Sequence, residues 1–305
     1  MFTWRDGERL IRFGPLGPVE EPFQLLTTER AALPSLTDAA TQVVHVSPGR
    51  VDEVSAELLS SHSFDPGLLL LGLGGGRVID ATKAIAGAVG ARCGAIPTTL
   101  SGAEMTPFHR TPAGVQGARL VRPALVLADP ELMASAPAPK LAATAMNALA
   151  HALEALYTPF ANPVTSMAAL RAAALLATED RESLALGALL AGYASGSTGI
   201  AVHHAVCQTI VRTAGTPHAE TNAVMLPRSA AFVAGRDPAA LHGVDPQMLA
   251  RLAARAGVTK LSELGVTEER LDEVVEAIQQ HPALGNTPGG TPSAPELREL
   301  LAGAL

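Results

Sequence analysis

A short apolar run followed by three consecutive glycines constrains the fold of this chain more than any other feature. Residues 68–71 are all leucine, as expected of a parallel strand that is buried on both faces of a sheet. Gly74, Gly75 and Gly76 come shortly afterwards, and residues 78–89 have the apolar spacing of a helix. The order of strand, tight turn and helix predicts one unit of an α/β sheet.

Other strand and helix patterns extend this unit on both sides. Strands are predicted within residues 2–13 around the turn Asp6-Gly7, and at residues 23–27, 42–46, 93–97 and 124–128, with a helix at 51–59. Alternation of strands and helices predicts a doubly wound parallel sheet. After Asp129-Pro130 the strand patterns stop, and segments rich in Ala and Leu continue to the end. We therefore expect an α/β nucleotide-binding domain over residues 1–136 and an all-α domain over residues 137–305.

Composition excludes several classes of protein. The chain has 305 residues, 48% hydrophobic and 17% charged, as is typical of a globular protein. A net charge of -7, with 22 scattered Lys and Arg, gives no basic surface for nucleic acid. Cys93 and Cys207 are too few for a disulfide framework, so a reducing cytoplasm is expected. The uncharged residues 183–211 contain Gly, Ser, His and Gln, which favours buried helices over a membrane span.

The glycine turn is a candidate phosphate site. Glycines let the backbone approach a pyrophosphate, and a helix N-terminus offers N–H groups and a positive dipole end. Arg77 occupies the place of the final glycine of the G-x-G-x-x-G pattern, and a triple glycine after a strand is equally consistent with a purely structural turn. Thr98, Thr99 and Ser101 follow the next predicted strand and add hydroxyl groups, which favours the nucleotide-binding interpretation.

The helical half carries a set of spaced polar residues. Asn147 and His151 are four residues apart, as are His204 and Gln208, so each pair shares one face of a helix. His218 follows Pro217 and is expected in a loop. Helical pairs of this spacing together with a distant histidine can build a metal site. The simpler alternative for any one histidine is a hydrogen-bonded polar residue of the core.

Five segments carry a family resemblance: residues 74–83 (GGGRVIDATK), 97–107 (PTTLSGAEMTP), 146–157 (MNALAHALEALY), 203–207 (HHAVC) and 217–223 (PHAETNA). The first three are similar to the motifs GGGSxxDxxK, PTTxxGSExTP and DALxHxxE, and the last two to segments of maleylacetate reductases. On these residues the chain resembles the iron-containing (group III) alcohol dehydrogenase superfamily, most closely its maleylacetate reductase branch.

The resemblance implies a dehydroquinate synthase-like fold with NAD or NADP in the cleft between two domains. Carried over by motif, the cofactor-binding residues are Thr28, Gly74, Gly75, Gly76, Arg77, Asp80, Thr98, Thr99 and Ser101. The metal-ligand positions of metal-dependent members fall on Asn147, His151, His204 and His218. Maleylacetate reductases tend to carry Asn at the first of these positions and to work without metal, so no metal is expected here. Gln208 stands where the family usually places a further histidine.

The leading hypothesis is an NAD(P)H-dependent reductase of maleylacetate type, acting without metal on a small oxo or enoyl carboxylate or a carbonyl compound. His151, His204 and His218 are predicted to polarise the carbonyl or bind carboxylates, and Asn147 and Gln208 to bind substrate. A homodimer without nucleic-acid or membrane partners is expected. The alternatives are a non-redox biosynthetic enzyme, such as a lyase or cyclase, and a catalytically inactive binding protein.

Overall fold

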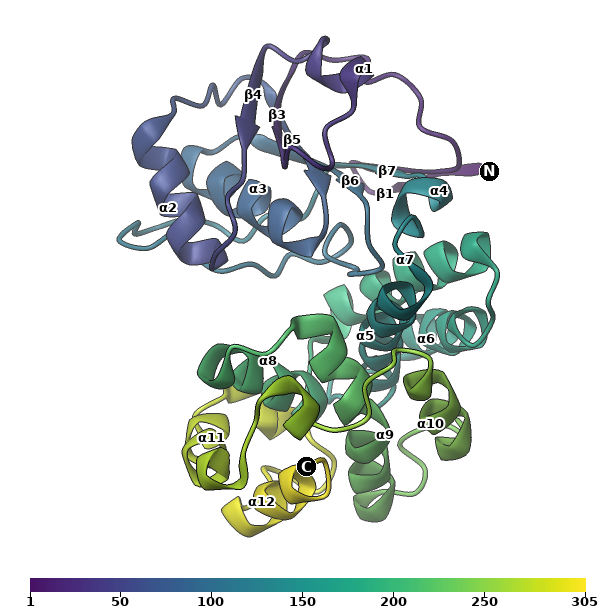
Figure 1. Cartoon of the computed structure of the whole chain (residues 1–305). Coiled ribbons are helices and arrows are strands. Elements are labelled where there is room, and N and C mark those ends of the chain that lie inside the picture. Colours follow the sequence, from purple (N-terminus) through teal and green to yellow (C-terminus); the bar gives the residue numbers. More distant parts are fainter. The chain divides into compact units, whose positions relative to one another are not determined.

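A computed structural model describes all residues 1–305 and divides them into two compact units, Met1–Ser135 and Ala136–Leu305 (Figure 1). The first unit is built on a sheet and the second contains only helices. The expected class, an α/β region followed by an all-α region, is confirmed.

Unit 1 contains a seven-stranded sheet in the order β1-β2-β7-β6-β5-β3-β4. The strands are β1 (Phe2–Asp6), β2 (Arg9–Phe13), β3 (Phe23–Thr27), β4 (Gln42–His45), β5 (Leu69–Gly74), β6 (Arg92–Pro97) and β7 (Leu125–Ala128). All neighbours pair in parallel except β1 and β2, which form an antiparallel hairpin at one edge. Its helices are α1 (Pro34–Thr37), α2 (Val51–Ser61), α3 (Gly76–Val89) and α4 (Pro130–Met133).

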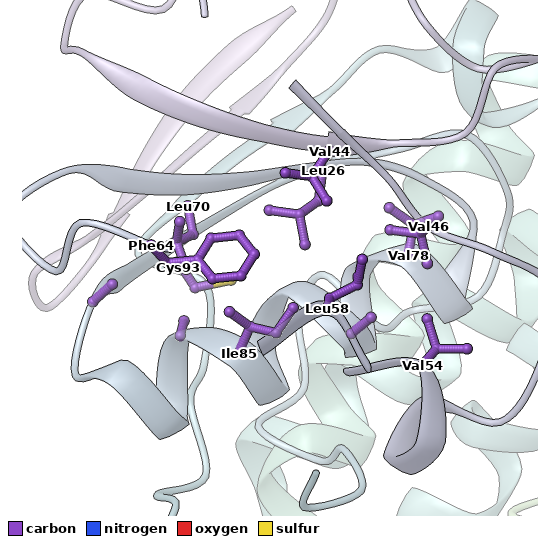
Figure 2. Packing of buried hydrophobic residues seen from close by; sticks show 13 residues of the cluster. Leu26, Val44, Val46, Val54, Leu58, Phe64, Leu70, Val78, Ile85 and Cys93 are labelled. Atoms are coloured by element: carbon purple, nitrogen blue, oxygen red, sulfur yellow. The ribbon is translucent and has the colours of Figure 1, made fainter. Parts of the chain in front are cut away.

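The two faces of the sheet bury alternate residues of the same strands. Leu26 and Leu70 point to the side covered by α2 and α3, where they pack with Ile85, as Figure 2 shows. Leu25 and Leu71 point to the other side, in a cluster that includes Leu36 of α1. Because both faces are buried, β3 and β5 consist almost entirely of buried side chains.

The glycine turn is shorter than predicted. β5 continues to Gly74, which is aligned with Pro97 of β6, and α3 already begins at Gly76. Only Gly75 therefore lies between strand and helix. A side chain at Gly74 would place its Cβ 2.7 Å from Cγ2 of Val78, so this tight connection requires glycine.

Unit 2 is entirely helical. Its elements are α5 (Ala138–Tyr157), α6 (Pro163–Leu176), α7 (Arg181–Thr198), α8 (Val202–Ala214), α9 (His218–Arg236), α10 (Pro246–Ala254), η1 (Ser262–Leu264), η2 (Glu268–Arg270), α11 (Leu271–Gln279), η3 (Pro282–Asn286) and α12 (Ala294–Ala302). α5 packs against α6, α7 and α9, and α8 packs against α9 and α11. No single helix is long and apolar enough to cross a membrane, although α7 and α8, which meet at a bend of 100°, pass that test as a pair.

The prediction that His218 lies in a loop is wrong. His218 is the first residue of α9, and the N–H of Thr221 already donates to the Pro217 carbonyl at 3.0 Å. Proline is readily accepted at the start of a helix, because no intrahelical partner exists there for its missing N–H group. The proline before His218 therefore marks a helix start.

Candidate active site

The glycine turn and the hydroxyl-bearing loop of unit 1 lie against each other. β5 and β6 are parallel neighbours, so their carboxyl ends meet at one edge of the sheet. A Cβ built on Gly75 would lie 3.2 Å from Cγ2 of Thr99, and one on Gly76 would lie 3.1 Å from Cβ of Ser101. The α3 N-terminus carries no side-chain cap. Uncapped backbone N–H groups beside hydroxyl groups form a site suited to an anion.

The other predicted cofactor residues have different surroundings. Arg77 is exposed in the first turn of α3, and the Thr98 N–H donates to the Gly74 carbonyl at 2.9 Å. Thr28 follows β3, where its hydroxyl accepts from the Ala31 N–H at 3.3 Å. Asp80 forms an ion pair within its own helix, since its Oδ1 lies 2.7 Å from Nζ of Lys83.

Lys83 was not predicted as a site residue, yet it anchors the hydroxyl-bearing loop. Its side chain is completely buried, and Nζ donates to the carbonyls of Ala103, Thr106 and Phe108 at 3.0, 3.2 and 2.6 Å. A buried ammonium group is stable only when it is paired and hydrogen-bonded. Lys83 therefore fixes the loop after β6 to the helix that follows the glycine turn.

Glu104 lies in the same loop and gives unit 1 a pH-dependent stability. Its carboxyl group is fully buried and has no hydrogen-bond partner, and burial raises its pKa from the ordinary 4.5 to about 7. The folded-state pKa is above the unfolded one. The stabilising contribution is therefore complete below pH 4.5 and is lost as the pH rises through 7.

We expect the difference in unfolding free energy between the wild type and Glu104→Gln to change by about 3 kcal/mol between pH 4.5 and pH 8, with the wild type losing stability. Urea unfolding of both proteins across this range measures it, because other groups titrate alike in the two chains. A constant difference across the range would show that Glu104 titrates normally.

In unit 2 two predicted histidines stack on each other, and one of them contacts a buried glutamate. The rings of His151 on α5 and His204 on α8 are stacked, with centroids 3.9 Å apart. Oε1 of Glu154, one turn further along α5, accepts from the backbone N–H of His204 at 3.1 Å, and Oε2 of Glu154 lies 2.6 Å from Nδ1 of His204. Nε2 of His204 is buried and has no hydrogen-bond partner. His204 therefore offers one nitrogen to a ligand and keeps the other on Glu154.

Asn147 and His218 contact each other. Nε2 of His218 lies 3.2 Å from Oδ1 of Asn147, so this ring nitrogen is the donor of the pair. Asn222 donates to the backbone carbonyl of His218 at 2.7 Å, and its Oδ1 lies 2.9 Å from Nε2 of His203. Nδ1 of His203 lies 3.2 Å from the Ser229 hydroxyl. Amide and hydroxyl groups thus determine which ring nitrogen of each histidine carries the proton.

The remaining predicted residue, Gln208, contacts a histidine from a distant segment. Its Oε1 lies 3.3 Å from Nε2 of His281, the residue before η3. His151 in turn has Nδ1 3.1 Å from the Ser195 hydroxyl of α7. Four of the five residues predicted in the helical half are therefore joined, through His203 and Asn222, in one polar cluster of α5, α8 and α9, and Gln208 pairs with His281.

Burial keeps His151, His203 and His204 neutral. It lowers the pKa of His204 and of His203 to about 3, and it lowers the pKa of His151 well below its usual value. The repulsion among neighbouring rings acts in the same direction. Burial also raises the pKa of Glu154. Neutral imidazoles are therefore the expected state of these three residues, and the Glu154 carboxyl group keeps its proton to a higher pH than usual.

These donors do not fit a metal ion. Oδ1 of Asn147 and Nε2 of His218 are hydrogen-bonded to each other, and a nitrogen that donates a proton has no lone pair for a metal. No group of three or more His, Cys, Asp or Glu side chains is arranged to hold a metal.

An apolar cavity of about 190 Å³ lies elsewhere in unit 2. Leu141, Met146 and Leu149 line it from α5, and Leu184 and Leu252 from α7 and α10. These α5 residues lie on the face of the helix opposite His151 and Glu154. The cavity includes none of the predicted site residues.

Sequence patterns missed the partners that organise the cluster: Glu154, Ser195, His203, Asn222 and His281. A signal existed for Glu154, which is seven residues after Asn147 and therefore on the same helix face. His203 precedes His204 directly and carried a weaker signal. Nothing in the sequence connects His281 with Gln208, which are 73 residues apart.

Comparisons with known proteins agree with this architecture. Residues 141–292 match the C-terminal domain of the Fe-containing alcohol dehydrogenase family. Maleylacetate reductase 1 of Rhodococcus opacus is 33% identical over 261 residues, which are 77% of this chain and 72% of that protein. The crystal structure of maleylacetate reductase from Agrobacterium tumefaciens has a TM-score of 0.79 and 29% identity, covering 93% of this chain and 89% of the other.

A more distant structure shares the fold alone. Sulfoacetaldehyde reductase from Bifidobacterium kashiwanohense, solved in complex with NAD+, has a TM-score of 0.74 at 22% identity and covers 93% of this chain and 91% of the other. Fold and relatives together define an oxidoreductase of the two-unit α/β and all-α class. The chain belongs to the iron-containing alcohol dehydrogenase family, among whose members it is similar to maleylacetate reductases.

Proposed function

We propose that this chain is an NAD(P)H-dependent reductase of a small oxo or enoyl carboxylate, with maleylacetate as the first substrate to test. The observation that carries the proposal is the buried pair of Glu154 and His204, whose Nε2 has no partner within the protein. The similarity to maleylacetate reductases supports the substrate class.

The residues of unit 1 fit the phosphates of a nicotinamide cofactor. A Cβ at Gly75 or Gly76 would crowd Thr99 or Ser101, and Arg77 adds an exposed cation to the first turn of α3. Backbone N–H groups at a helix start are suited to bind a pyrophosphate. When bound, such a cofactor supplies the hydride of the reduction.

Glu154 and His204 provide the proton that must accompany the hydride. With the Glu154 carboxyl group protonated and bonded to Nδ1, Nε2 of His204 carries a proton and donates it to the substrate. As Nε2 loses this proton, the proton of Glu154 moves to Nδ1, and the imidazole remains neutral throughout. Burial favours this route because it disfavours an imidazolium ion. One proton from solvent then restores the pair.

The proposal is tested by following the oxidation of NADH and NADPH by maleylacetate at 340 nm with the purified full chain. We expect turnover that saturates with substrate. Binding of either cofactor without oxidation, together with chemical change of another substrate while the cofactor stays unchanged, would favour a non-redox enzyme.

Turnover is expected to be independent of metal, since Asn147 and His218 use their ligand atoms on each other. Elemental analysis of the purified protein should find no stoichiometric iron or zinc, and prolonged treatment with a chelator should leave turnover unchanged. One metal ion per chain that is lost together with activity would contradict this.

NADPH is expected to bind at least as tightly as NADH. Thr27 and Thr28 at the end of β3 carry no carboxylate to repel a 2′-phosphate, and exposed Arg30 offers a cation. Fluorescence titration gives both dissociation constants, and Arg30→Ala should weaken NADPH alone. Arg251→Ala, at an exposed position of α10, is the matched control and should leave both dissociation constants unchanged. A strong preference for NADH would argue against this role of β3.

A further inference from the structure

His281 is held in one proton arrangement by two hydrogen bonds. It is the N-cap of η3, and its Nδ1 accepts from the backbone N–H of Ala283 at 3.2 Å. A ring nitrogen that accepts from an N–H group carries no proton, so in the neutral ring the proton is on Nε2. Nε2 lies 3.3 Å from Oε1 of Gln208 and therefore donates to it.

This contact fixes the orientation of the Gln208 amide. An amide has one acceptor end and one donor end, and only the oxygen can face the N–H of His281. The NH₂ group of Gln208 is thereby turned away from His281. Gln208 is also the one partly exposed residue between Ala201 and Thr209.

The donor end lies beside the proton-transferring pair. Gln208 is four residues after His204 on α8, which places the two side chains on one helix face about 6 Å apart along the axis. His281 is near enough that its charge would lower the pKa of His204. The donor amide of Gln208 and the unpartnered Nε2 of His204 therefore occupy successive turns.

We propose that the Gln208 amide donates to a carboxylate or carbonyl oxygen of the substrate, and that His281 is the positioning residue that keeps its donor end outward. The inference rests on the proposed reductase function and specifies the substrate class. It requires an acceptor oxygen about one helical turn from the atom that receives the proton. Removing a hydrogen bond to a charged oxygen should weaken substrate binding by about 10- to 100-fold.

Two substitutions at His281 separate positioning from capping. His281→Asn places an acceptor where Nδ1 was and keeps the η3 cap, but it loses the donor to Gln208. His281→Gln places a donor near the position of Nε2 and loses the cap. We expect His281→Asn to raise the KM for maleylacetate about 10- to 100-fold with little change in kcat, and His281→Gln to recover most of the affinity.

The opposite order, with His281→Asn normal and His281→Gln impaired, would show that His281 merely caps η3 and would overturn the proposal. Equal effects of both variants, accompanied by equal losses of melting temperature, would do the same. A double-mutant cycle adds a second test. Gln208→Leu combined with His281→Asn should raise the KM no further than Gln208→Leu alone, whereas additive effects would show that the two residues act separately.

An experiment that does not depend on turnover tests this inference separately from the proposed reaction. Long-range ¹H–¹⁵N correlation spectra of the full chain should show His281 protonated at Nε2, and the Gln208 side-chain amide, assigned with Gln208→Leu, should shift in His281→Asn. Protonation at Nδ1 would overturn the positioning role even if the enzyme reduces maleylacetate. Absence of NADH and NADPH oxidation alongside the expected spectra would overturn the reductase function and the substrate assignment together, while the amide orientation would stand.

Discussion

Replacing Glu154 with Gln is expected to lower kcat for NADPH-dependent reduction by about two orders of magnitude, the scale of losing a general acid. The glutamine oxygen can still accept from the His204 backbone N–H, which Glu154 binds at 3.1 Å, so the local fold is retained. The amide cannot pass a proton to Nδ1, however, and the relay to Nε2 is interrupted. Steady-state kinetics and the melting temperature of the same preparations measure the two effects separately.

Glu182→Gln is the matched control, since Glu182 is an exposed carboxylate in the first turn of α7. It should change neither kcat nor melting temperature. His204→Asn is the companion variant, because Asn retains a polar group near the Nδ1 position that can hydrogen-bond to Glu154, and it removes Nε2. It should show the same loss of kcat. Unchanged kcat with a lowered melting temperature in both active-site variants would show that the pair is a structural element of the core.

The sequence predicts the elements of this chain better than it predicts their partners. The strand at residues 23–27 and the helix beginning at Val51 could be predicted, because the spacing of apolar residues within each segment is enough to indicate its secondary structure. The start of α9 at His218 was misread because a proline breaks a helix or begins one according to tertiary context. The antiparallel edge strand β1 likewise depends on where its hairpin docks.

Within the candidate site, the sequence predicts which residues lie near each other only where one helix carries them. Asn147, His151 and Glu154 share a face of α5 by their spacing. The contact between Glu154 and His204 joins residues 50 positions apart, and that between Gln208 and His281 joins residues 73 apart. Such pairs are created by helix packing, which leaves no periodic trace in the sequence. The same holds for Lys83, whose burial depends on how the loop after β6 folds over α3.

Replacing Lys83 with Met is expected to lower the free energy of unfolding by about 3–5 kcal/mol, the scale of breaking a buried ion pair. Methionine fills similar space without the ammonium group, so Asp80 loses its partner at 2.7 Å. The buried carbonyl of Ala103 also loses its donor. Urea unfolding measures the loss, and Lys140→Met, which removes a surface ion pair with Glu220, should cost less than about 1 kcal/mol.

The same substitution tests how the hydroxyl-bearing loop reaches the glycine turn. Thr99 and Ser101 precede the segment that Lys83 holds, so releasing the segment should let both hydroxyls move away from Gly75 and Gly76. At temperatures where Lys83→Met remains folded, NADPH should bind at least about 10-fold more weakly. The hydroxyl groups of Thr99 and Ser101, which are held in place in the wild type, would then have to be ordered on binding. A folded Lys83→Met protein with wild-type affinity for NADPH would show that the loop keeps its position without this lysine, and that the glycine turn alone organises the phosphate site.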